Sequence, residues 1–271
     1  MSRRTVLVRG SGDVGSAVAH VLHAAGYGVA IHDIATPAAP RRGMAFTDAV
    51  FAGTCELEGV QARRVDEPSE LAAALERRDA ITVTTIDLTA VLGALRPAVL
   101  IDARMRKRAR PESQRDLAAL TIGLGPNVVA GETTHLAIET QWGEDLGRVL
   151  EAGATRALGG EPRSFDGHAR DRFVYAPLAG VLRTSARIAQ RVRAGEVVAM
   201  IGDEPLAAPL DGILRGLTHD GVHVEAGAKV VEVDPRGDVS KVTGIGERPR
   251  RIGEGVLRAI EQSPADPASG A

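Results

Sequence analysis

The chain has a single cysteine and few lysines, and both scarcities exclude classes of site. Cys55 has no second cysteine with which to form an internal disulfide, and one thiol cannot hold a zinc ion or an iron–sulfur cluster. No apolar run approaches the ~20 residues of a membrane helix, and the N-terminus lacks the pattern of a signal peptide. We therefore expect a cytoplasmic protein without a membrane segment.

The charge balance and the histidines exclude further partners. The formal net charge is −2, so we expect neither nucleic acid nor an anionic membrane as a partner. His20 with His23, and His219 with His223, have the spacing of paired ligands, but neither pair has a third ligand at metal spacing. We predict no metal site, and a buried, inert thiol for Cys55.

The first half of the sequence alternates strand-like and helical runs. Residues 5–9, 28–32, 81–85 and 98–101 are short and apolar, and residues 14–25, 69–78 and 88–95 have helical patterns. This alternation is typical of a parallel sheet covered by helices. We predict an α/β, Rossmann-like domain over residues 1–160 that binds a nucleotide or another cofactor.

The second half contains an internal repeat. Residues 176–183 (APLAGVLR) return as 208–215 (APLDGILR), and residues 192–195 (VRAG) return as 224–227 (VEAG), both at an offset of 32. The repeat resembles the half-motifs of the biotinyl/lipoyl-like barrel-sandwich hybrid fold, which predicts a small all-β domain over residues 172–240. The hairpin over residues 200–206 has no lysine, so we expect neither biotin nor lipoate. Residues 241–271 are expected to form a C-terminal helix and a frayed tail.

A glycine motif follows the first predicted strand. Gly10, Gly12 and Gly15 fit the G-x-G-x-x-G pattern, in which the turn and the helix N-terminus bind a phosphate. Asp33 ends the second strand, where it can accept a ribose hydroxyl, and Arg41 and Arg42 follow closely enough to bind a 2′-phosphate. This pattern indicates NAD(P), FAD or another adenosine ligand. The alternative is that the glycines serve only helix–strand packing. The candidate cofactor-binding residues of the turn are Gly10, Ser11, Gly12, Asp13, Val14 and Gly15.

Asp13 is an unusual member of this turn. Its carboxylate would repel a pyrophosphate if it pointed inward, so we expect it to face solvent or to cap the helix.

Further candidates follow later strands. Asp102, which ends a strand, and Arg104, which opens the basic segment after it, are both cofactor-binding candidates. Arginine binds phosphate in a bidentate manner, and a carboxylate can orient polar groups of the ligand. A solvated charged loop is the alternative. The remaining cofactor-binding candidates are Gly123, Gly125, Glu139 and Arg148. A structural role for Glu139 is the alternative reading of that residue.

Segments along nearly the whole chain resemble the YqeB-type accessory proteins of selenium-dependent molybdenum hydroxylases, which are related to the XdhC/CoxI maturation factors. The segments are residues 12–13, 41–42, 45–50, 60–65, 100–104, 122–126, 137–140, 146–149, 233–237 and 251–257. The resemblance implies a maturation factor that binds NAD(P) or a molybdopterin-type cofactor. It implies a hydroxylase subunit and other maturation factors as partners, and we expect a homo-oligomer. Residues 141–145 and Asn127 depart from the family pattern.

Two alternatives stand beside this hypothesis. An NAD-dependent oxidoreductase would explain the glycine turn and Asp33, but the sequence shows no convincing acid/base pair. A non-catalytic docking scaffold would leave the nucleotide site empty. The sequence does not assign a reaction, and the catalytic residues are unknown.

Overall fold

The computed structural model describes residues 5–106, 111–159 and 162–263. The predicted frayed tail from residue 264 onward lies outside the described residues. The main sheet has nine strands in the order β10-β9-β7-β6-β1-β2-β5-β4-β3. Its strands are β1 (Thr5–Arg9), β2 (Gly28–His32), β3 (Thr54–Leu57), β4 (Val60–Arg64), β5 (Ile81–Thr84), β6 (Val99–Asp102), β7 (Leu120–Leu124), β9 (Leu136–Ile138) and β10 (Val149–Leu150).

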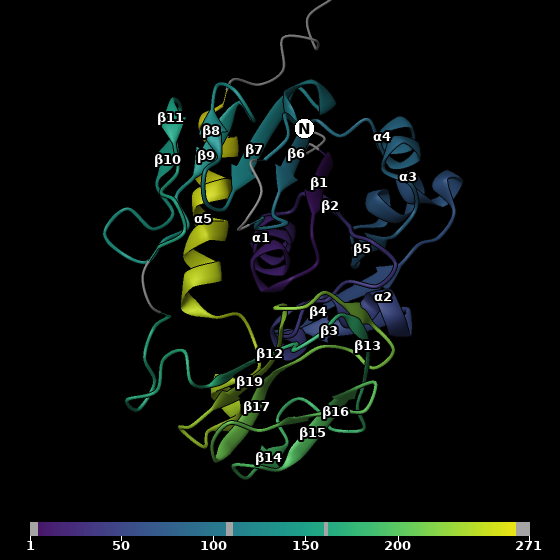
Figure 1. The fold of residues 1–271 in the computed structure, drawn as a ribbon. Coiled ribbons are helices and arrows are strands. Elements are labelled where there is room, and N and C mark those ends of the chain that lie inside the picture. Colours follow the sequence, from purple (N-terminus) through teal and green to yellow (C-terminus); the bar gives the residue numbers. More distant parts are fainter. Residues whose placement is uncertain (1–4, 107–110, 160–161, 264–271) are drawn as a thin grey trace, which may run out of the picture.

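Helices cover both faces of this sheet (Figure 1). The helices are α1 (Asp13–Ala24), α2 (Asp48–Ala52), α3 (Pro68–Arg77), α4 (Leu88–Leu95) and α5 (Glu247–Gln262). Val6 and Val8 point to the face of α1 and α5, and Leu7 points to the face of α3 and α4. Alternate side chains of β1 are therefore buried on opposite sides, which suits its continuous apolar sequence. In the described part of the chain, every helix is too short or too polar to cross a membrane.

The predicted parallel, Rossmann-like sheet is wrong, because the sheet is mixed. The strands from β9 to β4 are parallel, but β10 runs antiparallel to β9 and β3 runs antiparallel to β4. Only Glu58 and Gly59 join β3 to β4, and both have positive φ angles, of 47° and 79°. A two-residue turn of this kind can only connect antiparallel strands.

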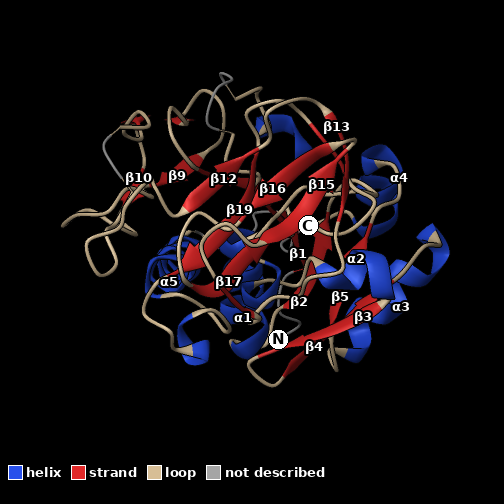
Figure 2. Ribbon diagram, turned by 60° about the horizontal axis from the view of Figure 1, so that its bottom comes forward, coloured by secondary structure: helices blue, strands red, loops and turns tan. Residues whose placement is uncertain are grey.

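Residues 173–234 form two four-stranded sheets, which we call the β unit. Their orders are β12-β19-β17-β14 and β16-β15-β13-β18, and most of these strands are labelled in Figure 2. One buried apolar cluster is shared between the two sheets. The two copies of the sequence repeat exchange strands: β13 of the first copy pairs with β18 of the second, and β14 pairs with β17. The strands are β12 (Phe173–Tyr175), β13 (Gly180–Arg183), β14 (Arg191–Val192), β15 (Val197–Ile201), β16 (Glu204–Ala207), β17 (Gly212–Leu217), β18 (His223–Val224) and β19 (Lys229–Asp234).

The structure does not show the predicted separate barrel-sandwich domain, because the β unit is tied closely to the α/β part. Leu217 N donates to Pro40 O at 2.8 Å, and Arg42 Nε donates to Leu217 O at 2.8 Å. The Phe51 ring stacks on His219 with a centroid distance of 3.8 Å. After the β unit the chain returns to the main sheet as α5, which packs against α1. The shorter elements are η1 (Arg42–Met44), η2 (Arg115–Leu117), η3 (Val239–Lys241), β8 (Val129–Ala130) and β11 (Gly153–Ala154).

Candidate functional site

The glycine turn lies between β1 and α1, at the carboxyl edge of the main sheet. Strand β1 lies between β2 and β6, and in α/β sheets ligands commonly bind beside such a reversal of strand order. Gly10 has φ +105°, and a Cβ on Gly15 would lie 2.0 Å from Gly10 O, so these two glycines are needed for close packing. Gly12 is different, because a Cβ there would have no neighbour within 4 Å. Gly12 is the N-cap of α1 and has no side chain to cap the helix, and the first-turn N–H of Val14 donates to Asp13 Oδ1 at 3.1 Å.

Asp33 follows β2 and is bonded to the glycine turn. Its Oδ2 accepts from Ser11 N at 2.6 Å and from Ser11 Oγ at 2.7 Å, and its Oδ1 accepts from Ile34 N at 2.8 Å. A carboxylate has about four acceptor positions, so Oδ1 can accept one more donor. Ile34 is 63% exposed, which places an apolar surface directly beside this carboxylate. Asp33 and Ile34 can thus accommodate a hydroxyl group and an apolar ring.

Arg9, the last residue of β1, is a functional candidate that the sequence analysis missed. It is half-buried and its Nη1 donates to Gln114 Oε1, while its Nε is buried without a hydrogen-bond partner among the described residues. No carboxylate of the described residues lies within ion-pair distance of it. Burial and then the charge of Arg104 lower its pKa, while the charges of Asp102 and Glu112 oppose this shift. Its signal in the sequence is an arginine that ends an apolar strand immediately before a glycine turn.

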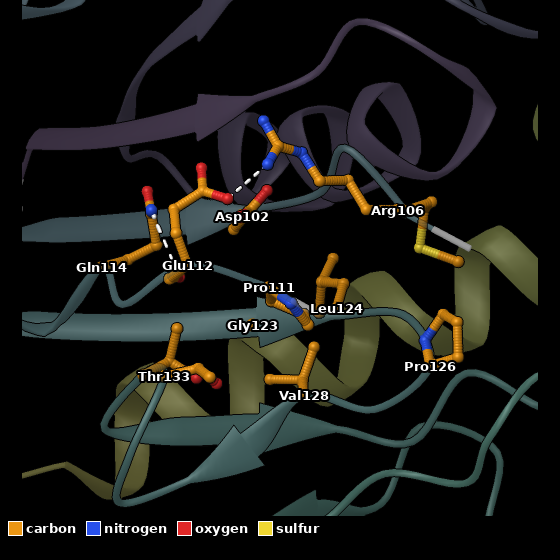
Figure 3. Close-up of a pocket in the computed structure, with 12 residues that line it drawn as sticks. Asp102, Arg106, Pro111, Glu112, Gln114, Gly123, Leu124, Pro126, Val128 and Thr133 are labelled. Carbon is orange, nitrogen blue, oxygen red and sulfur yellow. Dashed lines mark hydrogen bonds and ion pairs between the residues drawn. The ribbon is translucent and has the colours of Figure 1, made fainter. Parts of the chain in front are cut away.

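Arg104, in contrast, is neutralised by its neighbours. Its Nη2 lies 2.5 Å from Asp102 Oδ2 and 2.7 Å from Glu112 Oε1. Figure 3 shows Asp102 and Glu112 at the adjoining pocket, where Arg106 also pairs with Glu112. The volume of this pocket is about 10 Å³, enough for a single water molecule. This pocket has no room for a larger ligand.

The two arginines expected near a 2′-phosphate face the β unit. Arg41 donates to Glu232 through Nε at 2.8 Å and through Nη2 at 3.2 Å, and its Nη1 donates to Asp13 Oδ2 at 2.9 Å. Arg42 pairs with Asp48 at 2.8 Å and donates to the backbone of β17. Arg41 therefore connects the glycine turn to the β unit. This connection was missed because Glu232 is distant in the sequence.

Two of the later candidates, Glu139 and Arg148, are bonded to neighbouring groups of the protein. Glu139 is buried and accepts three backbone N–H groups, from Thr140, Gln141 and Arg156. The Arg148 side chain is 68% exposed and pairs with Asp145.

The two glycines after β7 pack tightly against neighbouring segments. A Cβ on Gly123 would lie 2.4 Å from Val128 Cγ1, and Gly125 has φ +116° beside Met105. The structure gives these four later candidates no contact with Arg9 or with the turn. Their assignment to a cofactor site stays a prediction.

Arg248, at the start of α5, is a second residue that the sequence analysis missed. Its Nε donates to Thr140 O at 2.7 Å, and burial lowers its pKa although Asp13 and Glu139 lie close enough to oppose this. Arg248 adds positive charge beside the start of α1.

Metal ligation and thiol chemistry find little support in the described residues. No three His, Cys, Asp or Glu side chains in the described ranges are grouped so as to hold a metal ion. Burial raises the pKa of Cys55 to about 11, so its thiol is protonated at neutral pH.

Comparison with known proteins gives one sequence relative. No family model matches the chain. The chain is 37% identical over 255 residues to the uncharacterized protein YqeB of Escherichia coli K12, a match that covers 94% of this chain and 47% of that protein. The chain therefore spans about half the length of this relative, whose name states no activity.

Similar solved structures include a succinylglutamate desuccinylase/aspartoacylase from Rhodobacter sphaeroides, with a TM-score of 0.22 and 15% identity over 86% of this chain and 53% of that chain. The ectoine utilization protein EutE (DoeB) from Ruegeria pomeroyi has a TM-score of 0.26 and 12% identity, and the match covers 86% of each chain. Likenesses this weak bring no activity to the present chain.

These findings correct the predicted identity and function. The curated relative is uncharacterized, and the similar solved structures are succinylglutamate desuccinylase/aspartoacylase proteins rather than XdhC/CoxI maturation factors. The prediction of a molybdenum hydroxylase maturation factor, with an NAD-dependent oxidoreductase as an alternative, is therefore wrong. The chain is an α/β protein with a mixed nine-stranded sheet, and what it binds has to be argued from its own residues.

Proposed function

We propose that the carboxyl edge of the main sheet binds a nucleoside diphosphate, or a larger ligand that contains one. The observation that carries this proposal is the half-buried Arg9, whose Nε has no hydrogen-bond partner among the described residues and which ends β1 just before the glycine turn. A half-buried guanidinium whose Nε has no partner among the described residues can donate to an anion nearby. The start of α1 carries backbone N–H groups that can bind the phosphate itself.

The neighbouring residues favour a nucleoside over a simple anion. The free acceptor position of Asp33 Oδ1 suits a ribose hydroxyl, and the exposed Ile34 side chain suits the face of a base. The same carboxylate disfavours a ligand with a 2′-phosphate. We expect ADP and NAD to bind, and NADP to bind more weakly.

A panel of ligands tests this proposal directly. Thermal unfolding is measured with ADP, NAD, NADP, CTP and inorganic pyrophosphate. A ligand present at 100 times its Kd adds about 2.7 kcal/mol to the free energy of unfolding, which gives a clear rise in Tm. The proposal is abandoned if no nucleotide raises the Tm at millimolar concentration.

Arg9→Gln is expected to weaken ADP binding about tenfold, because removing one nearby positive charge from a partly buried site costs on the order of 1–2 kcal/mol. Calorimetric titration measures the effect. The control is Arg183→Gln, which removes the same charge from a mostly exposed side chain of the β unit and should leave the Kd unchanged. Equal losses in both variants would mean that only the overall charge of the chain matters.

A further inference from the structure

Asp13 occupies two groups that a phosphate would bind at the glycine turn. It is the first residue of α1, and its Oδ1 accepts from Val14 N at 3.1 Å. Its Oδ2 accepts from Arg41 Nη1 at 2.9 Å. A first-turn N–H group and an arginine N–H group are typical phosphate ligands in proteins.

Arg41 is held in place from its other side. Its Nε and Nη2 are both bonded to Glu232, a fully buried carboxylate that also meets Arg172 and Arg215. These bonds leave Nη1 directed at the turn and fix its position there. Arg41 therefore presents a rigid N–H donor to whichever anion lies at the start of α1.

Asp13 is held less firmly than Arg41, because Arg41 is also bonded to Glu232. The Asp13 side chain is 23% exposed, and a rotation about its side-chain bonds would move the carboxylate without moving the backbone. An open Gly12 lies directly before it.

On the basis of the nucleotide site proposed above, we propose that Asp13 is a built-in competitor for the ligand. Its carboxylate holds the Val14 N–H and Arg41 Nη1 in the absence of ligand, and a phosphate has to displace it. Asp13 thereby lowers the affinity of the site for its ligand. A carboxylate that only stabilises the start of the helix would raise stability without lowering affinity.

The variant Asp13→Asn separates these roles, because it keeps the shape of the side chain and removes its charge. We expect about tenfold tighter binding of ADP and of inorganic pyrophosphate, since a like charge next to the phosphate is lost. We also expect a lower Tm, since the ion pair with Arg41 is lost. Asp13→Ser is a second variant with a small capping side chain, and it should show the same gain in affinity.

The matched control is Asp48→Asn. Asp48 is also the first residue of a helix and pairs with Arg42 at 2.8 Å, but it lies in α2 and not at the glycine turn. Its loss should leave the Kd for ADP unchanged. Titration of ADP into the wild type and the three variants gives distinguishable outcomes. A measurable Kd in the wild type with no gain in either Asp13 variant overturns the competitor but leaves the site standing. Absence of binding in all four proteins overturns both the site and the competitor.

Discussion

Glu232→Gln is expected to lower the free energy of unfolding by about 3–5 kcal/mol, the usual cost of breaking a buried ion pair by removing one partner. Glu232 is 0% exposed and lies among Arg41, Arg172 and Arg215. When Glu232 loses its charge, the buried Arg172 loses its carboxylate partner, and Arg41 keeps only its ion pair with Asp13. Urea unfolding measures the change. Glu225→Gln is the control. The Glu225 side chain is 85% exposed, so this substitution should change the free energy of unfolding very little.

The same carboxylate predicts how stability depends on pH. Burial alone would raise the pKa of Glu232, but the surrounding arginines outweigh it and lower the pKa to about 2. The folded pKa thus lies below the value of about 4.5 in the unfolded chain. The contribution of Glu232 is complete above this unfolded value and disappears as the pH falls through its folded pKa. The full contribution of this pKa shift to the free energy of unfolding is about 3 kcal/mol. Urea unfolding measures the free energy of unfolding at pH 5 and at pH 2.5. Between these two pH values, this free energy should fall less in Glu232→Gln than in the wild type. Equal losses would contradict the account of this charge cluster.

Gly15→Ala has the second large expected effect, a loss of about 3 kcal/mol in the free energy of unfolding, at the upper end of the range for overpacking. The added Cβ would lie 2.0 Å from Gly10 O, a backbone atom. This atom cannot easily move away, because Gly10 itself packs closely against the backbone of Ala103 and Arg104. The start of α1 and the end of β1 would have to separate. Chemical denaturation measures the loss.

Gly12→Ala is the matched variant for this prediction. Its Cβ meets nothing within 4 Å and its φ of −67° suits alanine, so we expect a loss of at most about 1 kcal/mol. ADP binding should nevertheless fall, because the new methyl group lies at the open start of the helix. If the two alanine variants were equally stable, the tight packing of Gly15 would be contradicted.

Local patterns in the sequence predicted several elements of the fold. The expected strand over residues 5–9 and the helix that begins near residue 14 coincide with β1 and α1, because apolar periodicity and glycine placement are local properties. The repeat over residues 176–227 likewise falls on corresponding strands of the β unit. The edges of the main sheet were predicted wrongly. The antiparallel β3 follows from the Glu58-Gly59 turn, a short signal that the strand and helix alternation conceals.

The contacts within the site could not be predicted from local patterns. Arg41 looked like a phosphate ligand because it follows Asp33 in the sequence, yet its guanidinium is held by Glu232, 191 positions away. Arg9 looked like the ordinary end of a strand, and only the fold shows that it is half-buried with no partner for its Nε among the described residues. Such pairings depend on how the β unit and the loop after β6 fold back onto the sheet.

A crystal structure of the wild-type chain grown with ADP is the most direct test of the nucleotide site. The account predicts the diphosphate at the start of α1, within hydrogen-bond distance of the first-turn N–H groups, with the ribose at Asp33. It also predicts that Asp13 has turned away from Arg41. ADP bound elsewhere, for example in the shallow groove beside Arg191 and Arg193, or no ADP in the crystal at saturating concentration, would contradict it.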